Sequence, residues 1–439
     1  MFYNQEDIIA APATAPGKGA IAIIRMSGEG CLKILKNCIT DGLVEIKPRA
    51  ATLVKIADER DEFDQVIIIY YAKPKSYTGE EMVEINCHGG DYITHRVMDL
   101  LCRKGARPAA PGEFTFRAFM NGKMDLTQAE AVSDLVSAES ELGNRNAARQ
   151  LAGGLSEAVM RIRRELISLL AELELELEFP DEEPLEADYD GWPERMQKAQ
   201  AELQSLIYWG SRGRVIREGY RVVIAGPPNS GKSTLLNALI GEERAITHHQ
   251  AGTTRDTLME SVEMDGLRVW LTDTAGLREG GGEVEAEGIR RARKEMENAD
   301  LVIYLFDLGE PLGEVKVNSR ETLIVGNKLD LYPGVQSAAA LKISALRGDG
   351  LEELRSMIVE KALDIGTEPA VAANERHLTA MRQAEANLRK AIEIAHSGGE
   401  TELMAFEIRE GLRHLGEIIG EEVTEEVLES IFSRFCIGK

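Results

Sequence analysis

The sequence has few cysteines, few aromatic residues and no long hydrophobic run. Its five cysteines are scattered through 439 residues and none stands in a CxxC spacing, so neither a zinc site nor a disulfide framework is indicated. No apolar stretch reaches the roughly 20 residues that a membrane-spanning helix needs. The first residues carry acidic side chains and no basic segment, which disfavours a signal peptide. We therefore expect a cytoplasmic protein that does not enter a membrane.

Positive charge is also scarce. The chain has 51 lysines and arginines against 74 acidic residues, which gives a net charge of −23. This balance argues against a protein that holds nucleic acid by bulk electrostatics, although it leaves room for a local basic patch. Two short basic runs, Arg161–Arg164 and Arg290–Lys294, are best interpreted as solvated helix faces.

The pattern of apolar residues, glycine and proline changes along the chain, and we predict the domains from these changes. Residues 1–120 alternate β-rich runs such as "QVIIIYYA" with glycine and proline, which is typical of an α+β domain. Residues 121–217 and 367–439 carry apolar residues at helical spacing. In residues 218–366 strands alternate with helices, the pattern of a parallel sheet. The sequence thus predicts a discontinuous helical domain into which an α/β domain is inserted.

The stretch "RVVIAGPPNSGKSTLLNALIG" is a hydrophobic strand, a glycine-rich loop and an apolar helix. This is the context of a phosphate-binding GxxxxGK[ST] loop, in which backbone N–H groups surround the phosphates. Lys232 is expected to reach the β- and γ-phosphate oxygens, and the Ser233 hydroxyl to bind Mg²⁺. The loop residues predicted to bind nucleotide are Asn229, Ser230, Gly231, Lys232, Ser233 and Thr234.

Two further stretches predict how the metal ion is held and which base is bound. "VWLTDTAG" ends a strand in Asp273, which is suited to hold Mg²⁺ through water. "LIVGNKLD" supplies Asp330, whose carboxylate can accept hydrogen bonds from the N1–H and 2-amino groups of guanine. Adenine has neither donor, so this arrangement specifies GTP. The other predicted contacts are Thr253 and Thr254 (the latter a magnesium ligand), Thr274, Ala275, Gly276, Asn327, Lys328, Ser344 and Ala345.

One group common in small GTPases is missing. The residue after the DxxG glycine is Leu277, which cannot orient the attacking water as a glutamine would. Either hydrolysis is very slow or another group supplies the orientation. The glycine-rich segment just downstream carries Glu279, Glu283, Glu285 and Glu287, most of which we interpret as solvated.

The sequence resembles the MnmE (TrmE) family of tRNA-modification GTPases from end to end. The resemblance rests on "GPPNSGKST", "AGTTRD", "DTAGLRE", "NKLD" and the terminal "CIGK", and on "APGKGAIAIIRMSG", "SYTGEEMVEINCHGG" and "PGEFTFRAFMNGKMDLTQAEAV" near the start. It implies an N-terminal folate-binding-like α+β domain that dimerises, a discontinuous helical domain and an inserted Ras-like P-loop GTPase domain.

The resemblance also implies residue roles. Arg25, Glu84 and Lys123 fall where the family contacts a formyl-tetrahydrofolate. Asn229 matches the asparagine that coordinates K⁺ beside the phosphates, and Glu285 the glutamate that positions the water. This chain departs from the family at His248 and His249 in the switch I loop, where relatives usually carry small or acidic residues.

The C-terminal "CIGK" raises a separate question. Gly438 and Lys439 do not fit a prenylation box, and no polybasic stretch precedes them, so lipidation is rejected. The apolar stripe Val427, Leu428, Ile431, Phe432 and Phe435 predicts a last packed helix. The resemblance places Lys439 near the folate and Cys436 near the substrate uridine. Whether Cys436 is a nucleophile or only a positional residue stays open.

The sequence thus predicts a homodimeric GTPase that acts with an FAD-containing MnmG-type partner. The pair would add a (carboxymethyl)aminomethyl group to C5 of the wobble uridine of certain tRNAs, with a formyl- or methylene-tetrahydrofolate as one-carbon donor. One alternative is a regulatory or ribosome-assembly GTPase without chemistry of its own. Another is a folate-dependent one-carbon transferase that acts on a small molecule.

Overall fold

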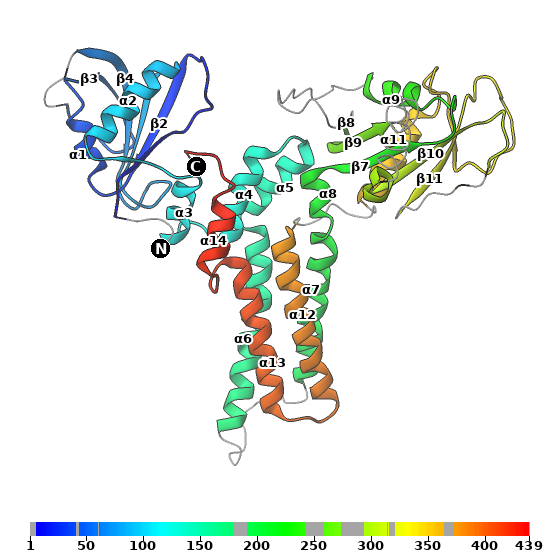
Figure 1. Cartoon of the computed structure of the whole chain (residues 1–439). Helices are drawn as coiled ribbons and strands as arrows, with labels where there is room; N and C mark the ends of the chain where they lie inside the picture. The colour runs from blue at the N-terminus through cyan, green and yellow to red at the C-terminus, as the bar shows by residue number, and fades with distance from the viewer. Residues whose placement is uncertain are drawn as a thin grey trace. The chain divides into compact units, whose positions relative to one another are not determined.

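The chain folds into two compact units, whose elements are labelled in Figure 1. The computed structural model describes residues 6–40, 44–59, 61–178, 191–241, 259–273, 294–313, 315, 321–363 and 373–438. The first unit contains Met1–Val136, Gln150–Leu203 and Thr379–Lys439, and the second contains Ser137–Arg149 and Gln204–Leu378. In chain order, most of the second unit therefore interrupts the first.

A six-stranded sheet with the order β3-β4-β5-β2-β1-β6 begins the first unit. Its strands pair antiparallel except β1 with β6. One face packs against helices α1 and α2 through residues such as Ile24 and Ile85. On the opposite face Ile21, Leu53 and Ile67 are exposed, whereas Ile9 and Ala11 of β1 are buried against Phe114 of α3. The strands are β1 Ile9–Pro12, β2 Ile21–Ser27, β3 Ala51–Ala57, β4 Glu62–Tyr71, β5 Met82–His88 and β6 Arg107–Pro108.

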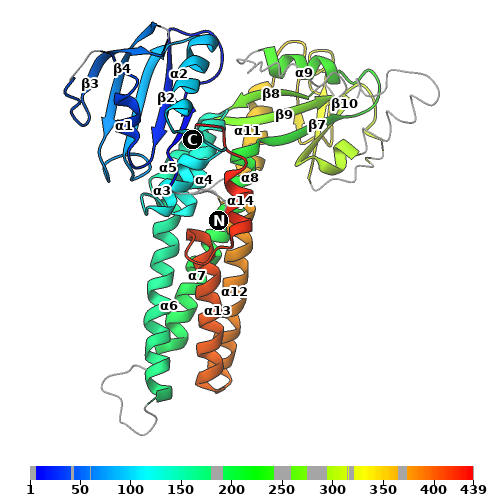
Figure 2. The ribbon, with the colours of Figure 1, turned by 60° about the vertical axis from the view of Figure 1, so that its left-hand side comes forward.

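Long helices make up the rest of the first unit, and α6, α12 and α13 run side by side in two views (Figures 1 and 2). Gln200 on α7 donates to Glu385 on α12, and Asn387 on α12 donates to Glu407 on α13. The bounds are α1 Cys31–Lys36, α2 Asp91–Arg103, α3 Glu113–Met120, α4 Leu126–Ser137, α6 Gly154–Glu178, α7 Trp192–Gly210, α12 Glu375–His396, α13 Thr401–Ile419 and α14 Glu425–Phe432.

Helical spacing explains why "LELELE" is a helix rather than a strand. Leu166, Leu169 and Leu173 are buried at intervals of three and four residues, whereas Leu175 and Leu177 are 59% and 43% exposed. A strand with this alternation would place all its leucines on one face. The described part of the chain contains no helix that is both long and apolar enough to cross a membrane.

The predicted C-terminal stripe is confirmed by α14 and the turn after it. Phe432 is fully buried and its ring lies 5.4 Å from that of Phe116, edge to face. Phe435 joins the same cluster. Gly112, with φ of 69°, lies so close that an added Cβ would stand 2.6 Å from the Phe432 carbonyl oxygen. The last helix is therefore fixed beside α3.

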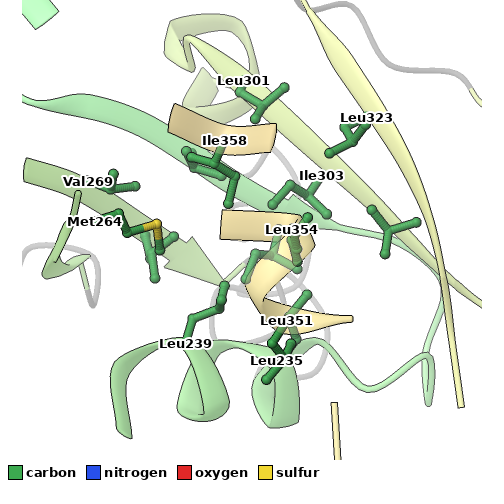
Figure 3. Packing of buried hydrophobic residues seen from close by; sticks show 14 of the residues in the cluster. Leu235, Leu239, Met264, Val269, Leu301, Ile303, Leu323, Leu351, Leu354 and Ile358 are labelled. Atoms are coloured by element: carbon green, nitrogen blue, oxygen red, sulfur yellow. The ribbon is translucent and has the colours of Figure 1, made fainter. Parts of the chain in front are cut away.

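The second unit is built on a six-stranded sheet in the order β12-β11-β10-β7-β9-β8. Only β8 and β9 pair antiparallel, so the predicted parallel sheet is confirmed. Figure 3 shows Leu235 and Leu239 from α9 and Leu354 and Ile358 from α11 meeting strand residues such as Ile303. The bounds are β7 Tyr220–Ala225, β8 Met259–Met264, β9 Leu267–Asp273, β10 Leu301–Asp307, β11 Thr322–Asn327, β12 Leu341–Lys342, α5 Glu141–Leu151, α8 Gly213–Glu218, α9 Lys232–Gly241 and α11 Leu351–Leu363.

Candidate functional site

The glycine-rich loop lies between the end of β7 and the start of α9, as the sequence predicts. Gly226 has φ of 147°, and a Cβ there would overlap the Leu305 carbonyl oxygen. Gly231 has φ of 95°, and a Cβ there would overlap the Asn327 side-chain amide. Both positions therefore require glycine, because side chains rarely adopt this backbone and the neighbours leave no room.

The first turn of α9 faces this loop. Lys232 is buried and its Nζ donates to the Pro227 carbonyl at 2.9 Å, which bends the side chain back over the loop. The N–H groups at the start of a helix have no partner within the helix and attract anions. Asn229 is exposed with φ of 64°, and Thr234 is exposed. The loop and the start of α9 therefore present polar groups of the kind that bind phosphate oxygens.

The two groups predicted to serve Mg²⁺ are in contact. Ser233 Oγ, at the start of α9, donates to Asp273 Oδ2 at the end of β9, at 2.6 Å. Hydroxyl and carboxylate oxygens are the ligands that Mg²⁺ prefers, usually with several waters retained. The donor set therefore fits this ion.

Asn327 joins the phosphate loop to the predicted base-binding loop. It is 3% exposed at the end of β11. Its Nδ2 donates to the Ser230 carbonyl at 2.8 Å, and its Oδ1 accepts from the Ala345 N–H at 3.0 Å. One buried amide thus holds both loops in register, a structural role that the motif alone did not reveal.

Asp330 and Lys328 are each oriented by a hydrogen bond. Ser344 Oγ donates to Asp330 Oδ1 at 2.7 Å. Lys328, with φ of 67°, donates to Asp307 Oδ2 at 2.7 Å. Burial would raise the pKa of Asp307, but the hydrogen bonds from Lys328 and from the Gly309 N–H hold that pKa below its usual value. The sequence analysis missed Asp307, which ends β10 outside any motif.

Several predicted residues lie outside the described residues. They are Thr253, Thr254, Thr274, Ala275, Gly276, Glu285 and Lys439. Their roles in nucleotide, water and folate binding stay predictions, as do those of Leu277, His248 and His249.

Two of the residues predicted to bind folate, Arg25 and Glu84, meet on the face of the first sheet that lies opposite α1 and α2. Arg25 on β2 and Glu84 on β5 are register partners, and Arg25 Nη2 donates to Glu84 Oε1 at 2.8 Å. The Tyr71 hydroxyl donates to the other Glu84 oxygen at 3.1 Å. The Arg25 guanidinium also lies 5.2 Å from the Tyr77 ring centroid and 5.8 Å from that of Phe114.

Glu84 and Lys123 line one pocket of about 460 Å³. Lys123 Nζ donates to the Pro74 carbonyl at 3.3 Å. Pro74 directly precedes the lining residue Lys75. A carboxylate beside aromatic rings and cations fits a pterin with a carboxylate-bearing side chain. The sequence analysis did not identify the other lining residues, Arg49, Tyr71, Lys75, Ser76, Tyr77 and Met82, because no motif marks them.

The C-terminal tail ends near the same sheet. A Cβ on Gly438, whose φ is 95°, would overlap the carbonyl oxygen of Pro12, the last residue of β1. Ala11, one residue earlier, is the register partner of Arg25. Cys436 is a free, exposed thiol two residues before Gly438. The structure thus places the tail beside the strand that neighbours Arg25.

Two family models match the chain, the MnmE helical domain over residues 126–436 and the GTP-binding protein TrmE N-terminus over residues 8–123. The protein named tRNA modification GTPase MnmE from Akkermansia muciniphila is 43% identical, over 99% of this chain and 100% of that relative. Its namesake from Chlorobaculum tepidum is 42% identical, over 98% and 97% of the two chains. That from Thermotoga maritima is 39% identical, over 99% and 100%. The chain therefore belongs to the MnmE (TrmE) family.

Proposed function

We propose that this chain is a GTP hydrolase that acts in tRNA modification. The observation that carries the proposal is a pair of hydrogen bonds in the second unit, Ser233 to Asp273 at the proposed phosphate end and Ser344 to Asp330 at the proposed base end. Near full-length relatives that bear the name tRNA modification GTPase support the pathway. The protein would act in the cytoplasm.

Guanine recognition follows from the donor and acceptor pattern of the base site. The Asp330 carboxylate would accept from the guanine N1–H and 2-amino groups while Ser344 holds its orientation. Backbone N–H groups around Ala345 would donate to the guanine oxygen. Adenine would leave the carboxylate unpaired at a cost of about 1–3 kcal/mol or more, so GTP is favoured.

At the phosphate end, Lys232 and the N–H groups of the glycine-rich loop would bind the β- and γ-phosphates. Ser233, with Asp273 behind it, would hold Mg²⁺, which neutralises charge on the phosphate oxygens when bound. Asn229 would contribute to a K⁺ site beside them. Glu285 would orient the attacking water, a task that Leu277 cannot perform.

The finer chemistry involves the first unit and a partner. We propose that the chain works as a homodimer with an FAD-containing, MnmG-type partner and adds a (carboxymethyl)aminomethyl group to C5 of the wobble uridine. Arg25, Glu84, Lys123 and Lys439 would bind a tetrahydrofolate that donates the one-carbon unit. The contact of the tail with β1 supports a role for Cys436 close to that site.

Reconstitution tests both levels of the proposal. The purified chain would be incubated with the FAD-containing partner, tRNA, GTP, K⁺ and a tetrahydrofolate labelled with ¹³C in its one-carbon unit. We expect phosphate release from GTP but not from ATP, and ¹³C in the C5 substituent of the wobble uridine by mass spectrometry. Modified uridine without the label would remove folate as the donor, and no GTP hydrolysis would overturn the proposed activity.

A further inference from the structure

The segment 138–142, which joins α4 to the first turn of α5, contacts the turn of the β8–β9 hairpin. The Leu142 N–H donates to the Gly266 carbonyl in that turn at 2.9 Å, and Glu139 forms an ion pair with Arg268 on β9. The Leu142 side chain packs against the hydrophobic core of the second unit's sheet. This segment is therefore held against a hairpin that lies far from it in the sequence.

The second strand of the hairpin ends at the candidate magnesium ligand. Arg268 is the second residue of β9 and Asp273 is the last, so about 17 Å of strand separates them at roughly 3.3 Å per residue. Asp273 accepts a hydrogen bond from Ser233. Strand β9 is paired with β7 on one side and with β8 on the other. It therefore moves as one body with the hairpin, and a shift at Asp273 is felt at Arg268.

Arg268 is incompletely satisfied for a buried cation. Its side chain is 17% exposed, and its Nε is buried without a hydrogen-bond partner among the described residues. The guanidinium lies 4.0 Å from the Trp270 ring centroid, and the Trp270 indole N–H donates to the Glu218 carbonyl at 2.8 Å. A buried N–H group without a partner is unfavourable. A second arrangement of this cation is therefore energetically accessible, which suits a switch better than a permanent anchor.

Helix α4 connects the segment 138–142 covalently to the first unit. The last residue of α4, Ser137, is where the chain enters the second unit. Near the start of α4, Leu126 packs in one cluster with Phe432 and Phe435, and Cys436 follows them directly. A helix of 12 residues is about 18 Å long and moves as a rigid rod. A displacement of the segment would therefore be passed along α4 to the residues that hold the C-terminal tail.

We propose that the segment 138–142 couples the nucleotide bound in the second unit to the C-terminal tail of the first. The proposal rests on the proposed function, in which GTP hydrolysis serves tRNA modification. Exchange of GTP for GDP changes the charge that Asp273 faces, and the β8–β9 hairpin responds by rearranging the Glu139–Arg268 pair. Because such coupling is reciprocal, the state of the tail changes nucleotide affinity by the same factor.

Two readouts on the full-length protein test the coupling. Each is taken with Mg²⁺ and either GDP or the β,γ-imido analogue of GTP. Hydrogen exchange of the Leu142 amide measures the opening of its bond to Gly266. The rate of alkylation of Cys436, whose thiol is exposed, measures the state of the tail. We expect each rate to differ about tenfold between the two nucleotides, which is within the usual range of coupling between sites.

Matched variants assign the effect to the ion pair. Glu139→Gln and Arg268→Gln should each abolish the difference at Cys436 and keep the GTP affinity of the wild type. The exchanged pair, Glu139→Arg with Arg268→Glu, should restore the difference, which a purely structural role of either residue would not do. Glu141→Gln is the control, because it removes the same charge from an exposed side chain close by, and it should keep the difference. If Arg268→Gln lowers the melting temperature, Glu139→Gln decides, because it changes an exposed side chain.

The outcomes separate this inference from the function on which it rests. Equal rates with the two nucleotides in the wild-type protein would overturn the inference. A difference at Cys436 that persists in Glu139→Gln would also overturn it, because the coupling would then run through other residues. In the reconstituted reaction Glu139→Gln should form about tenfold less modified uridine per GTP hydrolysed. Wild-type protein that shows both nucleotide-dependent rates but leaves tRNA unmodified would keep the coupling and remove the proposed function.

Discussion

Asn327 and Asp330 stand three residues apart and have different tasks. Asn327 is buried and its side-chain amide makes two hydrogen bonds within the protein. It donates to the Ser230 carbonyl and accepts from the Ala345 N–H. Asp330 is less buried and has one carboxylate oxygen oriented by Ser344. The first therefore shapes the site, and the second is available to recognise the base.

Replacing Asp330 by Asn should change the nucleotide preference. The side-chain NH₂ of asparagine is a donor and would face the donors of guanine, so these hydrogen bonds would be lost. Xanthine has a carbonyl at position 2, which can accept a hydrogen bond from that NH₂. We expect GTP affinity to fall about 100-fold and xanthosine triphosphate to bind better than GTP, because hydrogen bonds to charged groups contribute about 1.5–3 kcal/mol each. Competition binding measures the ratio. Unchanged GTP affinity would show that Asp330 does not contact the base.

Glu113 makes a second residue-scale prediction, about pH. It is fully buried and pairs with Arg107 and with the equally buried Arg117. Burial would raise the pKa of Glu113, but hydrogen bonds from Arg107, the Ala110 N–H and Arg117 hold that pKa below its usual value. Its stabilising contribution is therefore present above the unfolded pKa of about 4.3 and is lost as pH falls through the lower folded pKa.

The variant Glu113→Gln should lower the free energy of unfolding of the first unit by about 3–5 kcal/mol at neutral pH, since it breaks a buried ion pair and leaves Arg117 to pair with Glu80. Urea unfolding at neutral pH and below pH 4 measures this. The difference between wild type and variant should narrow in acid. Glu45→Gln, at an exposed position, is the control and should have little effect. A difference that stays constant with pH would contradict the assignment.

At the scale of elements, the candidate nucleotide site lies where β7, β9, β10 and β11 end. Asp273 and Asn327 are the last residues of β9 and β11. Parallel strands bring their carboxyl ends to one edge of a sheet, where ligands of such folds bind. The turn after β7 fits there only because Gly226 allows the backbone to approach the Leu305 carbonyl of β10.

Gly226→Ala should therefore disrupt the loop, because its φ of 147° and the close Leu305 carbonyl both exclude a Cβ. We expect loss of measurable GTP binding and a lower melting temperature. Gly241→Ala is the matched control, because a Cβ at the last residue of α9 meets nothing within 4 Å. It should leave GTP binding unchanged. Equal GTP binding by both variants would contradict the geometry.

The start of α5 and the residues just before it contact the sheet of the second unit, to which they belong. Leu142 N–H donates to the Gly266 carbonyl in the turn between β8 and β9 at 2.9 Å, and Glu139 pairs with Arg268 on β9. The Arg268 guanidinium also lies 4.0 Å from the Trp270 ring centroid. These contacts attach Glu139 and Leu142 to the β8–β9 hairpin, whose second strand ends in Asp273.

What the sequence predicts at this scale depends on local signals. The structure confirms the predicted glycine-rich loop and the predicted strand ends at Asp273 and Asn327. These features could be predicted because each motif directly follows a hydrophobic run in the sequence. Other contacts join residues that are separated in the chain. They are the Asp307–Lys328 ion pair, the packing of Phe116 against Phe432, and the pocket beside Glu84 that Arg49 and Lys75 help to line. No local pattern encodes such contacts, since they arise only when strands and helices pack.

At the scale of the whole molecule, the chain carries two candidate sites in two compact units. One unit contains the nucleotide site and the other the proposed folate site and the C-terminal tail. We propose that GTP hydrolysis by the second unit serves modification of tRNA.

The most direct test is the modified wobble nucleosides of a strain in which the gene is deleted, quantified by mass spectrometry of total tRNA. We expect aminomethyl-type uridines to disappear in the deletion strain. The wild-type gene and the Gly241→Ala variant should restore them. The Ser233→Ala variant, which lacks the hydroxyl that is hydrogen-bonded to Asp273, should not restore them. Unchanged uridines in the deletion strain would contradict the claim that this GTPase acts in tRNA modification.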